Sequence, residues 1–258
     1  YFKRARRWFP VIEPILKEHG IPDDFKYLPL VESNLSNVVS PAGATGFWQL
    51  MKSTAKLYNL EVNDVVDERY NVVLSTIAAC KYLKTCYKEF KNWTMCAAAY
   101  NMGIDGIKRQ LKRQKASSYY DLYLNTETSR YVFRLLAIKE ILSNPQKYGY
   151  HFREEHLYPT IQYSTITVNT SISNIAEFAK AQDINYRILK IHNPWLRKNY
   201  LTNKTGKNYK IRVPDSGYYV VELLGQDSLN TLLVPDSNQI RKDSVITNDT
   251  LDSRQEKE

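Results

Sequence analysis

The spacing of apolar residues changes near Tyr158, and this change is the strongest constraint on the fold. Before Tyr158, apolar side chains recur every three or four residues, which is the period of a helix with one buried face. After it, residues 160–163 and 165–168 alternate apolar and polar side chains, as half-buried strands do. The sequence therefore predicts a mainly α-helical part followed by a small α+β module.

The longest predicted helix begins at Asp67 and Glu68. Its apolar positions form one continuous stripe, which we expect to lie in the core: Tyr70, Val73, Ile77, Cys80, Leu83, Tyr87 and Phe90. Shorter helices are predicted from Pro10 to near Gly20, from Pro22 onward, at 50–58, from a Thr94 cap to Tyr100, and from a Thr128 or Ser129 cap to Ile141. Pro29 falls inside the second of these, where it should kink the helix or remove a hydrogen bond.

The module after Tyr158 has the order strand, helix, helix, strand. Its helices are predicted at residues 175–180 and 186–193, and its closing strand at 209–213. Residues 218–224 are compatible with one more strand, and the polar remainder from Asp236 is predicted to be disordered. We expect three parts: a helical domain at 1–150, the module at 155–214, and a partly disordered C-terminal extension at 215–258.

The chain is basic, with a formal net charge of +9. The last 43 residues carry eight acidic and four basic residues, a net −4, so the first 215 residues carry +13. Such a charge favours anionic partners, namely nucleic acid, a membrane surface or an acidic polysaccharide, without choosing among them. No stretch approaches the roughly twenty apolar residues of a membrane span. Because the chain begins at Tyr1, we expect a preceding segment that carries any signal peptide or lipid anchor.

The cysteine and histidine positions argue against a metal site. Cys80, Cys86 and Cys96 form no CxxC pair, and the four histidines lie in no cluster. Cys96 could reach either of the other cysteines, but we favour small buried hydrophobic residues over a disulfide. No metal or organic cofactor is expected.

Glu32 lies where a core side chain should be. Phe25, Leu28 and Leu35 recur at helical spacing, and Glu32 falls on the same stripe. A carboxyl group held against apolar surface resists ionisation, which makes it a candidate general acid near neutral pH. The alternative is an exposed glutamate on the polar edge of a frayed helix.

Four segments in this order resemble the signature segments of the soluble lytic transglycosylase family: Glu32-Ser33, residues 40–49, the Ala-Tyr-Asn-Met-Gly run at 99–103, and residues 127–132. The resemblance covers about residues 1–150 and implies a goose-type lysozyme-like catalytic domain. Trp48 precedes Gln49, as in a membrane-bound branch of the family in which a cell-wall-binding LysM module follows.

The resemblance implies a reaction that needs one carboxylate. The family cleaves the β-1,4 bond between N-acetylmuramic acid and N-acetylglucosamine in peptidoglycan without water, leaving a 1,6-anhydromuramoyl end. Glu32 would protonate the glycosidic oxygen and then accept the proton of the C6 hydroxyl as that oxygen closes on C1. A second catalytic carboxylate is not expected. We interpret Glu127, the other acid of the four segments, as a helix N-terminal acid.

The resemblance also implies substrate-binding roles for residues near Glu32. Ser33 and Ser40 would hydrogen-bond the Glu32 carboxylate or the muramoyl sugar. Gln49 would present its amide to a sugar N-acetyl or hydroxyl group. The neighbouring Phe47 and Trp48 are either a sugar platform or plain core.

The third and fourth segments would supply the remaining contacts. Tyr100 and Asn101 would line the cleft at the end of their helix, although Tyr100 fits a packing role equally well. Tyr131 would point its hydroxyl toward Glu32 and the reacting C1.

The module at 155–214 resembles a diverged LysM domain. Asn193-Pro194 stands where such domains often carry an asparagine, at the end of the second helix. Residues 170–176 replace the more usual Gly-Asp-Thr-Leu start. Two roles stay open, a glycan-binding module and a degenerate one that only packs on the catalytic domain.

Peptidoglycan glycan strands are the expected partner, and the periplasm or outer membrane is the expected location. The leading interpretation is a lytic transglycosylase. The alternatives are a cell-wall-binding protein without activity and a muramidase that uses water. Nucleic-acid binding is not expected, because the basic charge and 20 tyrosines accompany no recognised motif.

Overall fold

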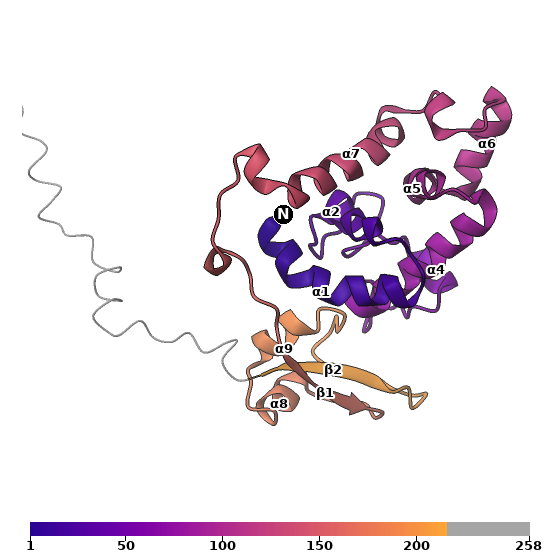
Figure 1. Cartoon of the computed structure of the whole chain (residues 1–258). Helices are drawn as coiled ribbons and strands as arrows, with labels where there is room; N and C mark the ends of the chain where they lie inside the picture. The colour runs from indigo at the N-terminus through magenta and orange to yellow at the C-terminus, as the bar shows by residue number, and fades with distance from the viewer. Residues whose placement is uncertain (216–258) are drawn as a thin grey trace, which may run out of the picture. The chain divides into compact units, whose positions relative to one another are not determined.

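Helices dominate the chain up to Ser143, and a pair of strands follows (Figure 1). The computed structural model describes residues 1–215. The strand predicted at 218–224 and the disorder predicted from Asp236 lie outside the described residues. The predicted fold class, mainly α-helical with a small α+β module after it, is confirmed.

The elements follow one another with short connections. The helical part contains α1 (Phe2–Glu18), α2 (Leu28–Ser33), α3 (Lys52–Leu57), α4 (Val72–Phe90), α5 (Trp93–Met102), α6 (Ile104–Gln114) and α7 (Thr126–Ser143). The module contains β1 (Tyr163–Val168), α8 (Ile175–Lys180), α9 (Tyr186–His192) and β2 (Tyr209–Pro214). Single 3-10 turns lie between them, at Asp23–Tyr27, Glu68–Tyr70, Tyr119–Asp121, Pro145–Tyr148 and Glu154–His156.

The core of the helical part is built around α5, which packs against α4, α6 and α7 (Figure 1). Ala97, Ala98 and Ala99 are buried, and their small side chains let the neighbouring helices approach closely. The three cysteines of α4 and α5 are also buried in this core, as free thiols. The predicted role of the cysteines as buried apolar residues is confirmed.

The first helix is longer than predicted. α1 begins at Phe2, and both Pro10 and Pro14 lie inside it. Each proline removes one backbone donor. The helix continues nevertheless, because Ala5, Ile12 and Leu16 are buried along one face, and this burial outweighs the local cost.

The helix that carries Glu32 starts later than predicted. A 3-10 turn, Asp23–Tyr27, takes up the residues after Pro22, and α2 begins only at Leu28. Pro29 therefore falls in the first turn, where its missing N–H has no intrahelical partner to lose. The predicted kink at Pro29 is wrong for this reason.

Asparagines cap the long helices, in place of the predicted caps. Asn71 accepts backbone N–H groups at the start of α4, Asn92 does so at α5, and Asn125 at α7. The caps predicted at Thr94 and at Thr128 or Ser129 are wrong. The side-chain oxygen of an asparagine cap accepts from backbone N–H groups two or three residues ahead. Each helix therefore begins directly after its asparagine, which for α5 and α7 is earlier than predicted.

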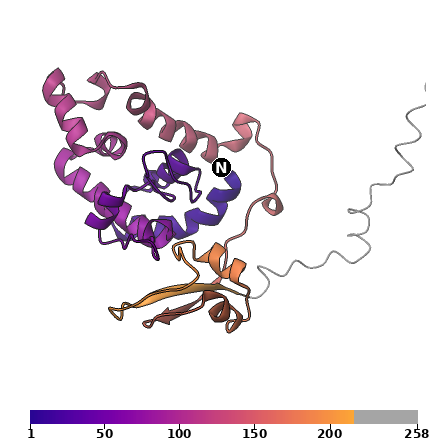
Figure 2. The ribbon, with the colours of Figure 1, turned by 180° about the vertical axis from the view of Figure 1, so that it is seen from behind.

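The module follows the predicted order. β1 and β2 pair antiparallel with Ile166 opposite Ile211 (Figures 1 and 2), and α8 has the predicted bounds. The strand predicted at 160–163 is wrong, because only Tyr163 belongs to β1. In the described part of the chain, no helix combines the length and apolar character needed to cross a membrane.

Candidate active site

Glu32 lies on a helix of fewer than two turns whose other residues are largely buried. Leu28, Leu30 and Val31 are in the core, and the helix ends at Asn34 in the left-handed conformation with φ 60°. The Glu32 side chain is partly buried, as the apolar stripe predicts. The alternative of an exposed glutamate is therefore excluded.

Tyr131 provides the direct polar contact of Glu32. Its hydroxyl donates a hydrogen bond to Oε1 of Glu32, and the tyrosine, on α7, is only 2% exposed. Burial raises the pKa of the Glu32 carboxyl to about 7. The Tyr131 hydrogen bond opposes this rise, the negative charge of Glu127 adds to it, and the charge of Arg134 opposes it. Both protonation states of Glu32 are accordingly well populated near neutral pH.

Two phenols beside Glu32 stay protonated. Burial, and then the negative charge of Glu32, raise the pKa values of Tyr131 and Tyr100 well above the ordinary phenol value. The Tyr100 hydroxyl donates to the Trp48 carbonyl at 2.8 Å. Both tyrosines are therefore hydrogen-bond donors at any pH at which the protein would work.

Trp48 and Phe47 belong to the core and are not a sugar platform. Trp48 is fully buried, and its indole N–H donates to Thr76 Oγ1 at 2.8 Å. Phe47 is 4% exposed and packs edge-on against Trp8. Of the two interpretations of this pair, the packing one holds.

Asn101 joins the end of α5 to the start of α7. Its Nδ2 donates to Glu127 Oε1 at 2.8 Å, and its Oδ1 accepts from Thr128 Oγ1 at 2.8 Å. Glu127 lies in the first turn of α7, a position at which the helix dipole favours acidic residues. The prediction that Glu127 is a helix N-terminal acid is confirmed.

The serine hydroxyls near Glu32 form hydrogen bonds with backbone groups. Ser33 Oγ lies within hydrogen-bond distance of the Pro29 and Phe47 carbonyls, at 3.0 and 2.8 Å. Ser40 Oγ accepts from the backbone N–H of Ala44 at 3.0 Å. The expected contact of either serine with the Glu32 carboxylate is absent, because these hydroxyls stabilise the turn after α2 and the loop that follows.

Gln49 is held within the same loop. Its Nε2 donates to the carbonyls of Val38 and Gly46 at 3.0 and 2.8 Å. Its backbone is left-handed, with φ 45°. Since both amide hydrogens are used, the amide oxygen is the atom left to meet a ligand.

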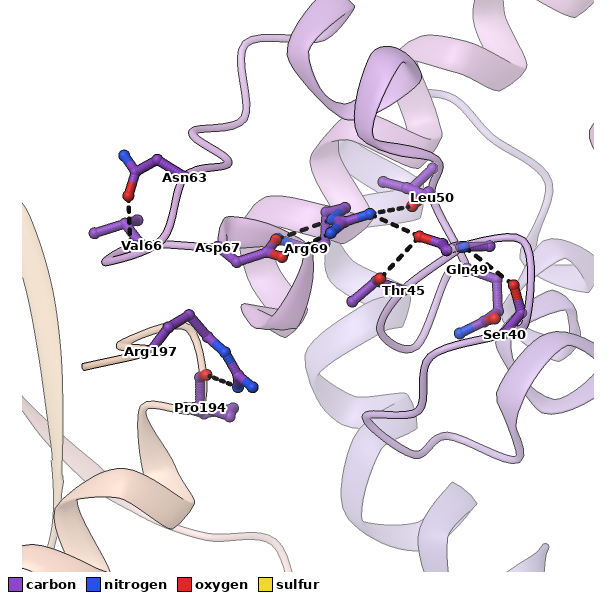
Figure 3. A network of polar contacts seen from close by, with 12 residues as sticks. Ser40, Thr45, Gln49, Leu50, Asn63, Val66, Asp67, Arg69, Pro194 and Arg197 are labelled. Atoms are coloured by element: carbon purple, nitrogen blue, oxygen red, sulfur yellow. Dashed lines mark hydrogen bonds and ion pairs between the residues drawn. The ribbon is translucent and has the colours of Figure 1, made fainter.

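A buried ion pair that the sequence analysis does not predict supports this loop (Figure 3). Arg69 and Asp67 pair at 2.7 Å with side chains that are 10% exposed, and Arg69 Nη1 donates to the carbonyls of Gly43 and Leu50. A Cβ on Gly46 would lie 2.1 Å from the Arg69 carbonyl oxygen. Asp67 and Arg69 follow no pattern in the sequence that would predict a contact with this loop. The contact becomes visible only in the folded structure.

Hydrogen bonds connect the four signature segments in a closed chain. Each contact joins two segments that are far apart in sequence: Tyr131 to Glu32, Asn101 to Glu127, Tyr100 to the Trp48 carbonyl, and Ser33 to the Phe47 carbonyl. The segments that the sequence places in four separate regions thus form one site. Within residues 1–215, no group of three or more His, Cys, Asp or Glu side chains could hold a metal ion.

Comparison with known families identifies both parts of the chain. Residues 10–123 match the transglycosylase SLT domain, and residues 164–217 match the soluble lytic transglycosylase C-terminal LysM-like domain. Membrane-bound lytic murein transglycosylase D of Escherichia coli (strain K12) is 33% identical over 187 residues, which is 70% of this chain. The chain spans 40% of the length of that relative.

Two solved structures show a more distant likeness. The 70 kDa soluble lytic transglycosylase of Escherichia coli is 20% identical, with a TM-score of 0.46 over 54% of this chain and 24% of that one. The lytic transglycosylase Slt of Pseudomonas aeruginosa is 19% identical, with a TM-score of 0.44 over 58% and 26%. Scores this low add nothing to the family assignment, which rests on the two matched domains and their order. The chain belongs to the soluble lytic transglycosylase family.

Proposed function

We propose that this chain is a lytic transglycosylase that cleaves the β-1,4 bond between N-acetylmuramic acid and N-acetylglucosamine of peptidoglycan and leaves a 1,6-anhydromuramoyl end. The observation that carries the proposal is the Glu32 carboxyl, held by Tyr131, with a pKa of about 7. A group with such a pKa can give up a proton and take one back within a single cycle.

The reaction uses the two states of Glu32 in turn. Protonated Glu32 gives its proton to the glycosidic oxygen as the C1–O bond breaks, so the leaving sugar departs as an alcohol. Ionised Glu32 then accepts the proton of the C6 hydroxyl while that oxygen bonds to C1. Glu32 is protonated again at the end, and no water is consumed.

Tyr131 stabilises the intermediate state of this cycle. Its hydroxyl donates to the carboxylate at the moment when Glu32 carries a charge in a desolvated site. A hydrogen bond to a charged group contributes about 1.5–3 kcal/mol. Tyr131 also lies beside the oxygen that handles the proton, which is consistent with a position near the reacting C1.

Glu127 fits a supporting role better than that of a second catalytic acid. Its carboxylate accepts from Asn101 and lies at the N-terminal end of α7. Both features fit a structural carboxylate that fixes its neighbours. Glu127 would keep Asn101 in place and, through its charge, keep the pKa of Glu32 high.

The remaining proposals concern substrate and location. Asn101 and the Gln49 amide oxygen would meet sugar hydroxyl or N-acetyl groups, with Ser33, Ser40 and Tyr100 shaping the site. The relative named above is described as membrane-bound and as acting on murein. By analogy, this chain would act on glycan strands of the cell envelope, in the periplasm or at the outer membrane.

The decisive test replaces the proton donor and keeps its shape. Glu32→Gln should abolish the release of anhydro-muropeptides from purified sacculi, measured by mass spectrometry, because an amide cannot donate the proton. Glu18→Gln, an exposed glutamate at the end of α1, is the matched control and should leave release unchanged.

The same digest separates the alternatives. A muramidase would yield products heavier by one water. A wall-binding protein without activity would sediment with sacculi and yield no product from the wild-type chain. Unchanged anhydro product from the Glu32→Gln variant would contradict the assignment of Glu32.

A further inference from the structure

A cavity of about 500 Å³ lies away from Glu32, between α4 and the β1–β2 sheet. Its volume is within the range of about 300–1,000 Å³ that is usual for ligand sites. One wall is aliphatic and comes from the helical part, through Leu60, Val73, Leu74 and Ile77. None of the four signature segments contributes a lining residue.

The opposite wall is the outward face of the sheet. Ile211 and Val213 of β2 are buried, so the alternating residues Lys210 and Arg212 point to the other face. Arg212 is paired with Thr165 of β1, and all three polar residues line the cavity. The sheet therefore presents charged side chains to the aliphatic wall of α4.

Backbone pairing fixes the two walls relative to each other. The backbone N–H of Asp67 donates to the Trp195 carbonyl at 2.9 Å, and Val66 and Leu196 form a β-bridge. Lys207 then bonds the carboxylates of Glu61 and Glu68 at 2.9 and 2.6 Å. The cavity is thus a preformed feature of residues 1–215.

The lining carries four basic side chains and one acidic one. Glu68, the acidic residue, is already paired with Lys207. Lys81, Lys210 and Arg212 have no carboxylate partner among the described residues. The cavity consequently holds an excess of unpaired positive charge.

Arg212 shows most clearly that this charge lacks a carboxylate partner within residues 1–215. Its guanidinium group is partly buried and lies over the Tyr163 ring, 5.1 Å from the centroid. Burial lowers the pKa of the Arg212 guanidinium, and a hydrogen bond with Tyr163 only partly opposes this fall. Since Tyr163 offsets only part of the desolvation cost, a ligand carboxylate at this place would offset the remainder.

We propose that this cavity binds the peptide stem of peptidoglycan, through its carboxylates and its short aliphatic side chains. The inference rests on the proposed function, because it takes peptidoglycan as the substrate. Stem peptides carry several carboxylates spaced between alanine-sized groups. Beside its aliphatic wall, the cavity offers three cations that have no carboxylate partner within residues 1–215. A neutral glycan would leave these cations unpaired.

Two of the three aromatic residues that line the cavity cannot stack on a base. Trp195 and Tyr209 stack on each other with centroids 5.7 Å apart, and both are buried, so neither offers a free face to a base. The stem peptide would tether a glycan strand beside the enzyme while another part of the strand occupies the site of Glu32.

The test measures binding by isothermal titration calorimetry with the full chain. The probe is a synthetic stem tetrapeptide with free carboxylates, compared with the same peptide fully amidated. The Lys81→Glu/Lys210→Glu double variant should weaken binding of the free peptide by about tenfold or more, because it replaces two attractive contacts to the peptide carboxylates with two repulsive ones. The wild-type chain should bind the amidated peptide as weakly as the double variant binds the free peptide.

A matched control is available with one lysine on α4 and one in the module. Lys88 on α4 and Lys180 on α8 are exposed and line no part of this cavity, so Lys88→Glu/Lys180→Glu makes the same change in net charge. This control should bind the free peptide like wild type. Equal weakening in both double variants would overturn the proposal, since it would indicate only a general charge effect.

Other outcomes are equally informative. If inorganic phosphate or vesicles of anionic lipid bind through Lys81 and Lys210 while the stem peptide does not, the proposal is overturned. Failure of peptide binding together with normal anhydro-product release would reject this inference and leave the proposed function intact. Peptide binding without any anhydro product would reject the proposed reaction and leave this binding site intact.

Discussion

The pKa of Glu32 depends on the balance between desolvation of its carboxyl group and the hydrogen bond from Tyr131. Burial favours the neutral carboxyl, and the Tyr131 hydrogen bond favours the ionised one. The apolar stripe predicts the burial of Glu32 from sequence alone. It could not predict that Ser33 bonds the Phe47 carbonyl, because that contact depends on where a loop returns after 14 residues.

Tyr131→Phe should shift the pH dependence of activity. Without its hydroxyl donor, the ionised form of Glu32 is less favourable, so the pKa of Glu32 rises further. The rate for free enzyme and substrate requires protonated Glu32 and therefore falls above its pKa. In a pH profile of kcat/KM, the alkaline limb should move to higher pH, with a rate lower by about tenfold or more. An unmoved limb would show that Tyr131 does not act on Glu32.

At the scale of elements, amphipathic stripes predicted which segments are helical, but the ends of those segments depended on single side chains. Asn71, Asn92 and Asn125 set where three helices begin. α6 has no counterpart among the predicted helices, because most of its residues are polar or charged. The loop at 40–50 takes its shape from Arg69, a partner outside the loop.

Two glycines of this loop allow a matched test of that support. Gly43 and Gly46 have φ values of 83° and 81°, but only at Gly46 would a Cβ collide with the Arg69 carbonyl oxygen. Gly43→Ala should lower the free energy of unfolding by about 1 kcal/mol, the cost of the left-handed backbone. Gly46→Ala should cost about 2 kcal/mol more, measured by urea denaturation. Equal losses would mean that the loop does not rest on Arg69.

At the scale of residues 1–215, the module is attached to the helical part through a polar joint. Lys207 pairs with Glu61 and Glu68, and the Glu68 side chain is only 5% exposed. Lys207 lies far from both glutamates in the sequence, and no hydrophobic or charge pattern connects them. The contact between the module and the helical part could therefore not be predicted. The predicted boundaries at 150 and 155 stay predictions, because Tyr1–Asp215 forms one compact unit.

Removing Lys207 should destabilise the chain measurably. Lys207→Met leaves the buried Glu68 carboxylate without its cation, and we expect a loss of about 2 kcal/mol in the free energy of unfolding. Lys147→Met breaks an exposed pair with Glu140 and should have a much smaller effect, because solvent screens both charges. Thermal unfolding of the wild-type chain and of both variants would measure these losses of stability. If the two losses are equal, the joint contributes no more than a surface ion pair.

The ionisation of Glu32 can be measured directly by carbon NMR of the full chain with ¹³C-labelled glutamate carboxyl groups. The Glu32→Gln variant identifies the resonance by its disappearance. The carboxyl of Glu32 should titrate with a pKa of about 7. A pKa near the ordinary glutamate value of about 4.3 would contradict the desolvated proton carrier on which the proposed reaction depends.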